Sequence, residues 1–204
     1  RTYVHLGDRE FTYENWMAAI RAGNTFVTIG PLLDLQVEGQ HPGSAVALAD
    51  SGGTVSVSWR VESVRVPVFS VELIVGGLVV EESTYDGVLE ASGSASVQVE
   101  SSSWIALRVR GSYGGRQEDI AAHTSAVQVL TGDKEIFSPA DAHVVLNQIE
   151  GALAYVDTIA TRPEAERFRQ MRASIEAAHN RLHQRMHRHG LFHSHSPMHD
   201  HHDE

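Results

Sequence analysis

The sequence of 204 residues contains no cysteine, a single lysine and no long hydrophobic run. The lack of cysteine excludes disulfide bonds, thiolate zinc sites and cysteine nucleophiles, and it leaves the cellular compartment open. Lys134 is the only lysine among 16 basic residues, so no polybasic patch is available to bind an anionic membrane surface. A run of about 18 apolar residues, the signature of a transmembrane helix, is also missing. We therefore expect no membrane partner.

Positive charge is scarce and unevenly placed. Residues 1–161 carry 9 Lys and Arg against 20 Asp and Glu, whereas residues 162–204 carry 7 against 6, together with nine of the 13 histidines. An acidic body of this kind repels phosphate backbones, which argues against a nucleic-acid partner. The length predicts one or two globular domains.

The first helical pattern covers residues 13–22, and both of its ends can be identified. Thr12 is the predicted N-cap, Phe11 and Trp16 stand at the positions of a hydrophobic staple, and Gly23 supplies the C-terminal cap. One face of this helix is apolar, formed by Tyr13, Trp16, Met17 and Ile20. Too little sequence precedes the helix to cover that face, so we expect an upstream domain to cover it.

The next segment, Ala22–Leu33 (AGNTFVTIGPLL), joins this helix to two short strands through a Gly-Pro corner. It lies close to a chain start that is not Met. We interpret it as a structural hinge between two units, and the chain as the downstream part of a larger protein.

From residue 25 to 130 the pattern is that of short strands. Apolar and polar residues alternate, as in residues 55–61 and 105–109, and the pair Gly76-Gly77 predicts a tight hairpin. Roughly eight strands with regular turn signals predict a mostly β fold with added α structure: an antiparallel β-sandwich of immunoglobulin-like type. Because the cysteine pair of antibody domains is missing, this likeness concerns architecture only.

The last third predicts an antiparallel helical hairpin. Ser138 is the N-cap of its first helix, and Thr161 with Glu164 forms a capping box for the second. Each helix has an apolar seam at three- and four-residue spacing: Leu146, Ile149, Leu153, Val156 and Ala160 in the first, and Phe168, Met171, Ile175, Ala178 and Leu182 in the second. A low-complexity tail follows Gly190.

The histidine-rich tail is the most conspicuous candidate for metal binding. Imidazole and carboxylate groups suit Zn²⁺, Ni²⁺ or Cu²⁺. A mobile tail lacks the outer hydrogen bonds that fix ligands, so we interpret it as a solvated segment that binds metals opportunistically, with metal delivery, buffering or storage as the alternative. The candidate ligands are His193, His195, His199, His201 and His202.

Other candidates have plainer interpretations. His123 and Ser125 share one face of a predicted strand, so they could act together in catalysis. No acidic residue stands at a recognisable spacing to orient His123. The alternative is that His123 forms a hydrogen bond at the end of a sheet. Three histidines at helical spacing (His179, His183 and His187) could hold a metal, but we favour a polar outer face of the hairpin. For the three tryptophans (Trp16, Trp59 and Trp104) we favour core packing over sugar stacking. Several acidic residues form no recognisable calcium loop, so we interpret them as surface charge: Asp34, Glu38, Asp50, Glu81 and Glu82.

Taken in order, several motifs resemble the C-terminal region of CehA/McbA-type metallohydrolases. These are relatives of the PHP (polymerase and histidinol phosphatase) metal-dependent phosphoesterases and include carbaryl hydrolases. The matching segments are Arg1–Val4, Tyr13–Gly23, Ala22–Leu33, Leu73–Val80, Trp104–Gly111, Ala122–Ser125 and Asp141–Val156. The chain departs from the pattern at Asn24, Ile29 and Ala126, which replace a usual Arg, Asn and Pro.

The resemblance implies that residues 1–33 end an upstream PHP-like α/β barrel. Residues 34–131 would then be the β-sandwich, residues 132–189 the helical hairpin and residues 190–204 a disordered tail. The barrel would hold a divalent metal (Zn, Mn or Fe) through His-x-His and Asp-x-His motifs, and no such role transfers to His193-Ser194-His195.

We therefore expect an accessory C-terminal portion of a hydrolase acting on ester, carbamate or phosphoester bonds, inactive alone. Its expected partners are the upstream catalytic domain and a possible second copy of the chain. The alternative is a stand-alone β-sandwich module for protein or glycan binding, with a helical oligomerisation hairpin and a metal-scavenging tail.

Overall fold

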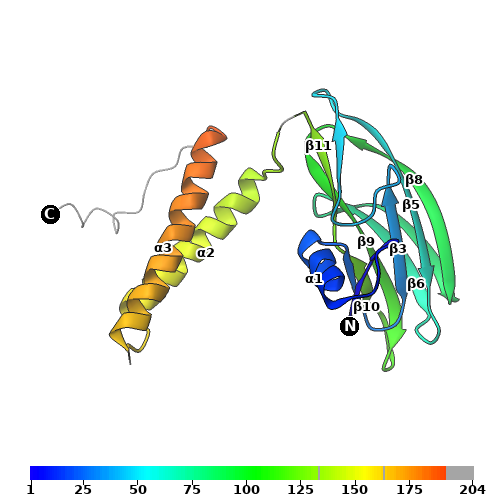
Figure 1. The fold of residues 1–204 in the computed structure, drawn as a ribbon, viewed down its shortest axis with the longest axis horizontal. Helices are drawn as coiled ribbons and strands as arrows, with labels where there is room; N and C mark the ends of the chain where they lie inside the picture. The colour runs from blue at the N-terminus through cyan, green and yellow to red at the C-terminus, as the bar shows by residue number, and fades with distance from the viewer. Residues whose placement is uncertain (133, 163, 192–204) are drawn as a thin grey trace. The chain divides into compact units, whose positions relative to one another are not determined.

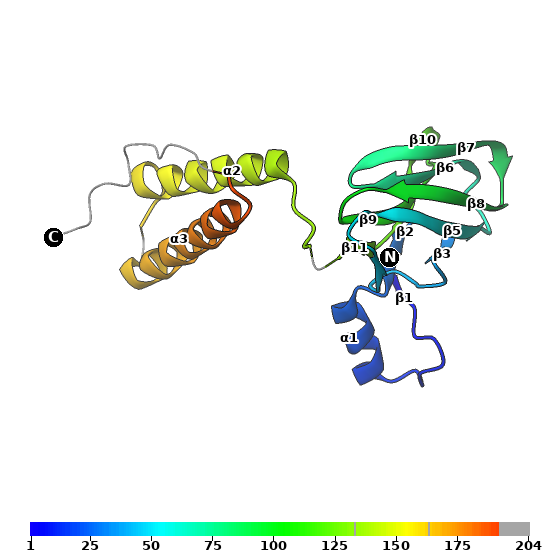
Figure 2. The same ribbon diagram turned by 90° about the horizontal axis from the view of Figure 1, so that it is seen from above.

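The computed structural model describes residues 1–132, 134–162 and 164–191, which fall into two compact units (Figures 1 and 2). The first unit is Arg1–Ile136, and it holds the described strands and the first helix. The second begins at Phe137 and holds a pair of helices. The sequence predicts the boundary between the two units after residue 131, and the structure places it a few residues later, after Ile136.

Within the described residues, the larger sheet of the first unit has eight strands. Its order is β1 (Thr2–Val4), β2 (Thr25–Thr28), β10 (Arg116–Thr124), β9 (Ser103–Tyr113), β11 (Val127–Thr131) and β4 (Ala45–Leu48). Strand β6 (Val68–Val75) also pairs with β9 and carries β7 (Leu78–Val88) along its other side. The pairs are antiparallel except for β4 with β11, which is parallel and corrects the prediction of a purely antiparallel arrangement.

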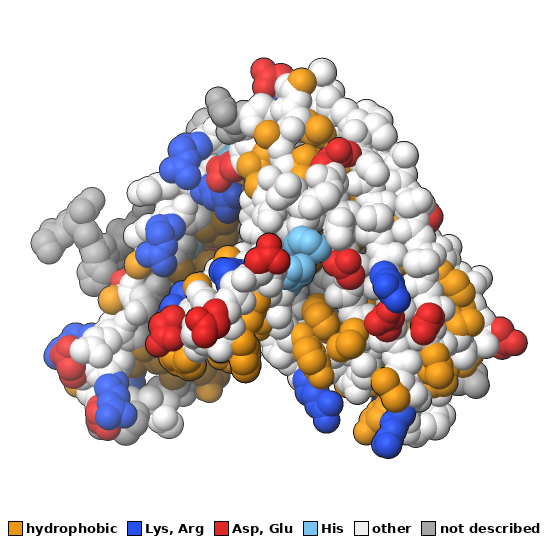
Figure 3. All heavy atoms as spheres, turned by 45° about the vertical axis from the view of Figure 1, so that its right-hand side comes forward, with side chains coloured by type: hydrophobic (Ala, Val, Ile, Leu, Met, Phe, Trp, Pro, Cys, Tyr) orange, Lys and Arg blue, Asp and Glu red, His pale blue; other side chains and the backbone are white. Residues whose placement is uncertain are grey.

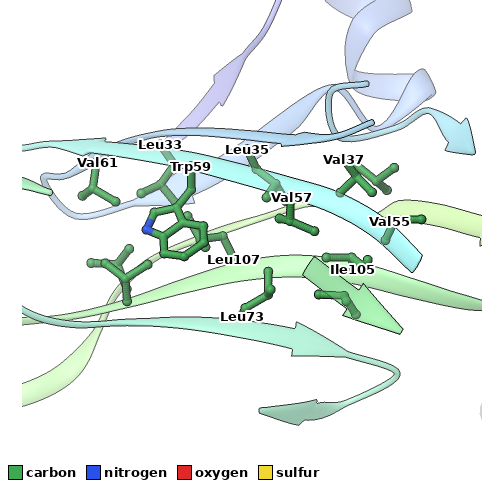
Figure 4. Packing of buried hydrophobic residues seen from close by; sticks show 14 of the residues in the cluster. Leu33, Leu35, Val37, Val55, Val57, Trp59, Val61, Leu73, Ile105 and Leu107 are labelled. Carbon is green, nitrogen blue, oxygen red and sulfur yellow. The ribbon is translucent and has the colours of Figure 1, made fainter. Parts of the chain in front are cut away.

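A second sheet contains, among the residues described, three antiparallel strands: β3 (Leu32–Val37), β5 (Gly53–Glu62) and β8 (Glu90–Val99). Alternate side chains of both sheets point into one buried hydrophobic cluster (Figure 4). The second sheet contributes Leu35, Val57 and Trp59, and the first contributes Leu73 and Leu107. The alternation predicted for residues 55–61 is therefore confirmed, because every second side chain of β5 is buried, and β3 shows the same pattern.

The Gly-Pro corner after β2 is the point where the chain passes from the first sheet to the second. Gly30 is required there, because a Cβ on this residue would collide with the side chain of Val66. Thr28 Oγ1 accepts a hydrogen bond of 2.9 Å from the backbone N–H of Gly30. Strands β1 and β2 thus belong to the eight-stranded sheet, and the assignment of residues 1–33 to the end of an upstream barrel stays a prediction.

Helix α1 (Tyr13–Ala22) begins and ends where the sequence predicts. Thr12 Oγ1 accepts a 3.2 Å hydrogen bond from the backbone N–H of Asn15, and Gly23 adopts a φ of 78° at the C-terminal cap. The predicted staple is wrong, because Phe11 is 82% exposed and does not pack on the helix. The ring of Trp16 lies 6.5 Å from that of Tyr13.

Strands β6 and β7 form the predicted tight hairpin. Gly76 and Gly77 have φ angles of 57° and 94°, the left-handed values that a primed two-residue turn requires. Val75 and Leu78 pair on either side of the turn. Strand β7 consequently lies at an edge of the larger sheet, with β6 as its hydrogen-bonded neighbour.

The second unit contains helices α2 (Pro139–Thr158) and α3 (Ala165–Arg188), which lie side by side (Figure 2). Ser138 caps α2 as predicted: its Oγ accepts a hydrogen bond of 3.3 Å from the backbone N–H of Asp141. The predicted Thr161 capping box is wrong. Glu164 itself occupies the N-cap position in an extended conformation, so it cannot be the third residue of the helix. In the described part of the chain, none of the helices α1, α2 and α3 combines the length and the apolar character of a membrane-spanning helix.

Histidines at helical spacing lie along α3, and the first of them corrects the prediction of a polar outer face. His179 is only 7% exposed, and its Nε2 lies 3.5 Å from Oε1 of Glu150 on α2. The rings of His183 and His187 follow along the same helix, with centroids 4.1 Å apart. The face that carries His179 therefore packs against α2.

Candidate functional site

Three side chains from separate parts of the first unit meet at one pocket. His5 follows β1, Asp34 lies in β3, and His41 lies in the turn that precedes β4. One potential ligand atom from each residue lies within 4.8 Å of the other two. We call this set the His-Asp-His cluster. Figure 3 shows one face of the molecule on which histidine side chains lie next to acidic ones.

Backbone geometry brings the three residues together. Asp34 points outward because its neighbours in β3, Leu33 and Leu35, point into the core. Asn24 connects the two histidine segments: its carbonyl accepts a 2.8 Å hydrogen bond from the backbone N–H of His5, and its Nδ2 donates one of 2.8 Å to the carbonyl of Pro42. Asn24 thus links the two segments that carry the histidines.

The turn that carries His41 is pressed against the end of α1. Gly43 has a φ of 89°, and a Cβ at this position would collide with the carbonyl oxygen of Ala22. Its N–H donates a hydrogen bond of 2.8 Å to the carbonyl of Ala126. Only glycine permits this close approach. The position of His41 is therefore set by packing of the backbone.

The polar atoms of the cluster are close but incompletely paired. Nδ1 of His41 lies 3.2 Å from Oδ1 of Asp34, and this buried nitrogen has no hydrogen-bond partner among the described residues. The rings of His5 and His41 have centroids 4.1 Å apart. Partial burial is the largest cause that lowers the pKa of His5, followed by His41; Asp34 opposes this shift and Arg9 adds to it. A lowered pKa favours the neutral imidazole, the form that can donate a lone pair.

The cluster lines a pocket of about 240 Å³ whose other walls include Thr25, Phe26 and Thr124. Sequence reasoning missed this site, because it treated Asp34 as surface charge and gave no role to the two histidines. Their spacing matches no ligand motif. Pairing of β1 with β2 and the close approach at Gly43 bring them together, and neither contact leaves a signal in the local sequence.

A second, larger hollow lies on the face of the eight-stranded sheet that points away from the core. Its volume is about 570 Å³, and its lining includes Trp104, Arg108, Ile120 and His123. We call it the outer-face groove. Trp104 is half-buried here, whereas Trp59 is in the core, so the prediction of core packing is confirmed for Trp59.

The candidate His123 lies in β10 and is exposed at this groove. Its Nδ1 lies 3.3 Å from the carbonyl oxygen of Thr124. The predicted partner Ser125 bonds elsewhere, since its Oγ lies 2.7 Å from Oγ1 of Thr25. This geometry matches the plainer interpretation, a histidine at a sheet end, and a catalytic role for His123 stays a prediction.

A buried carboxylate lies on the same strands as the groove. Glu72 of β6 is 5% exposed and forms ion pairs with Arg108 and with Arg110, the latter at 2.7 Å between Nε and Oε1. Burial raises the pKa of Glu72, but the hydrogen bonds and charges of the two arginines outweigh it and hold the pKa below its ordinary value. The group is therefore ionised at neutral pH.

The predicted tail ligands lie outside the described residues: His193, His195, His199, His201 and His202. Comparison with known families found no matching family model, and comparison with curated proteins found no matching sequence. Functional inference consequently depends on the surfaces and sites described above.

Proposed function

We propose that this chain is the accessory C-terminal portion of a PHP-like metal-dependent hydrolase acting on ester, carbamate or phosphoester bonds. In this proposal an upstream barrel binds the catalytic Zn, Mn or Fe ion and activates water for attack. Residues 1–33 form the surface on which that barrel packs, and the two facing sheets are an immunoglobulin-like sandwich behind it. The isolated chain is inactive.

The observation that carries this proposal is the exposed apolar surface of the first 32 residues. Phe11 and Tyr13 are 82% and 70% exposed. Further exposed apolar side chains come from adjoining segments: Tyr3, Val27, Ile29 and Leu32. These side chains come from neighbouring elements, because β1 pairs with β2 and leads into α1, and the strand register places Tyr3 and Val27 on opposite faces of that pair. Apolar surface of this kind marks an interaction site.

The partial packing of α1 supports the same conclusion. Ala19 is its buried residue, whereas Trp16, Met17 and Ile20 are half-buried and Tyr13 is exposed. The apolar face of the helix is therefore incompletely covered by its own unit. An adjoining domain would bury the remainder, and an aromatic side chain offers roughly 150–250 Å² for such burial.

A stand-alone binding module is the second candidate, and the outer-face groove favours it. The groove has a volume of about 570 Å³, within the size range of small-molecule sites. Trp104 and Ile120 offer apolar contacts, and Arg108 and His123 offer polar ones. Such a lining suits a planar or ring-shaped ligand, including a sugar, that stacks on the indole.

The upstream coding sequence provides the decisive test. We expect it to encode a strand-borne His-x-His motif, and we expect metal-dependent esterase turnover from the longer protein and none from residues 1–204 alone. Turnover by the short chain, or a longer protein that shows no metal-dependent hydrolysis, would overturn the proposal.

The docking surface can be tested separately with the upstream segment supplied as a second polypeptide. The double variant Phe11→Ser/Tyr13→Ser should weaken its co-purification by about tenfold or more, since two buried aromatic anchors are lost. Leu78→Ser is the control, because Leu78 is 73% exposed but lies in β7, which pairs with β6 and not with β1 or β2. Equal loss with the control would contradict the assignment.

A further inference from the structure

We propose that the His-Asp-His cluster binds a single Zn²⁺ ion through His5, Asp34 and His41. This site belongs to the chain itself and is separate from any metal of an upstream barrel. Its ligands come from three segments of the first unit, so a bound ion would tie the loop after β1 to β3 and to the turn before β4.

The donor set selects the kind of ion. Two imidazoles and one carboxylate suit a borderline divalent metal, as in zinc sites that keep one position for water. Ca²⁺ and Mg²⁺ prefer all-oxygen ligands, so imidazole disfavours them. The exposed side of the cluster leaves room for water as a fourth ligand, because His5 and Asp34 are both exposed residues.

The spacing of the donor atoms fits such an ion. Two ligands that are each about 2.0–2.2 Å from a tetrahedral zinc ion lie roughly 3.3–3.6 Å apart. His41 Nδ1 and Asp34 Oδ1 are 3.2 Å apart already. One potential ligand atom of His5 lies within 4.8 Å of a ligand atom of each of the other two residues. The His5 side chain would have to rotate to bring its donor nitrogen to the ion, and His5 lies in an exposed loop where such a rotation is feasible.

The unpaired nitrogen of His41 provides a second, independent observation. Nδ1 is buried and lacks a hydrogen-bond partner among the residues described, although a carboxylate oxygen is close by. A simple ion pair would place a hydrogen bond along this contact. A metal ion held between His41 Nδ1 and Asp34 Oδ1 would be a partner for both atoms, so no hydrogen bond between them would be needed. Burial of a polar atom that has no such partner costs free energy.

The backbone around the cluster supplies the rigidity that metal sites need. Asn24 hydrogen-bonds to both histidine segments, and Gly43 locks the turn of His41 against α1. Supporting interactions of this type orient ligands, and their loss typically costs about 10–100-fold in metal affinity.

The test uses the full chain with the five tail histidines named above replaced by Gln, so that opportunistic binding by the tail is removed. We expect one equivalent of Zn²⁺ in equilibrium dialysis and, with Co²⁺ as a spectroscopic substitute, visible absorption bands of low coordination number. His41→Gln and Asp34→Asn should each raise the dissociation constant by about tenfold or more and abolish these bands. Any binding by histidines of α3 is common to all variants.

His143→Gln is the matched control, because it removes an exposed histidine from α2 and leaves the cluster intact. Thermal unfolding without metal verifies that each variant is folded, and the Zn²⁺-dependent rise in melting temperature should be absent only in the cluster variants. Unchanged affinity and Co²⁺ bands in His41→Gln would overturn the proposal. None of these measurements involves hydrolysis, so failure of the proposed zinc site can be distinguished from failure of the proposed function.

Discussion

The two units of this chain are stabilised in different ways. In the β unit, twenty buried residues from both sheets form one cluster among the described residues. In the helical unit, the corresponding cluster has Ala142, Leu146 and Met186 as its buried members, and large apolar side chains such as Val144, Tyr155 and Ile159 remain exposed. The first unit has a complete core of its own, whereas the second has a single narrow seam.

Charge pairs occur in both units, but in different settings. In the β unit, Glu72 is buried between two arginines, so removing it would leave positive charge without its partner. In the helical unit, Arg172 pairs with Asp157 at 2.8 Å on a partly exposed surface. Exposed pairs contribute about 0–1 kcal/mol each. The helical unit therefore depends on its seam and its caps, which makes it the more easily unfolded of the two.

The largest expected effect is loss of core packing. Leu107→Ala should destabilise the β unit by about 2–5 kcal/mol, because it leaves a cavity in a fully buried cluster. Leu146→Ala should cost about 2 kcal/mol in the helical unit, since the narrow seam can relax around the gap. All three tryptophans lie in the β unit, so their fluorescence reports its unfolding, and far-UV circular dichroism at the helix band reports the helices.

Each of these substitutions should shift the transition of its own unit. If Leu107→Ala moved the fluorescence and helix-band transitions by the same amount, the two units would unfold as one, and the contrast drawn above would fail.

The next effect concerns the buried ion pairs. Glu72→Gln should lower the stability of the β unit by about 1–3 kcal/mol at neutral pH, because two arginines lose their charged partner. The pKa of Glu72 is lowered in the folded state, so its contribution is complete above about pH 4.5 and is lost as the pH falls through the lower folded pKa. Urea unfolding at several pH values should show the wild-type advantage shrinking in acid.

The matched control for this series is Glu62→Gln, which removes an exposed carboxylate paired with Arg60 in the same unit. It should change stability by less than about 0.5 kcal/mol at neutral pH. An advantage of Glu72 that stayed constant into acid would contradict the assignment of its stabilising role to charge.

The smallest effect concerns the helix caps. Ser138→Ala should lower the stability of the helical unit by about 1 kcal/mol, because the N–H of Asp141 loses its acceptor. Thr161→Ala should have almost no effect, since the structure places the N-cap of α3 at Glu164. Thermal unfolding followed at the helix band compares the two. Equal losses would restore the capping box that the sequence predicts.

Several local signals in the sequence identify local structure correctly, whereas the staple at Phe11 and the capping box at Thr161 are not formed. The ends of α1, the hairpin at Gly76-Gly77 and the alternation along β5 are each determined by neighbouring residues, and each is confirmed. Resemblance to the metallohydrolase family added a proposed role, but its motifs are short and leave the pairing of strands open.

The remaining features depend on contacts between distant segments. The parallel pairing of β4 with β11 arises from how the sheet is assembled, and burial of His179 depends on which face of α3 packs against Glu150. The His-Asp-His cluster is the clearest case. Its members are brought together by the hydrogen bonds of Asn24 and by the close approach that Gly43 permits. Neither contact can be predicted from the spacing of the three ligands in the sequence.

Strand β7 has a consequence for behaviour in solution. An edge strand presents unpaired backbone groups, and the exposed residues Leu78, Val79 and Val80 would make it a template for addition of a strand from another molecule. Glu81 and Glu82 follow directly on the same edge, and the chain carries a formal net charge of −10. Like-charged edges repel one another at neutral pH. The chain should therefore resist fibrillar association near pH 7, and high salt, which screens this repulsion, should weaken the resistance.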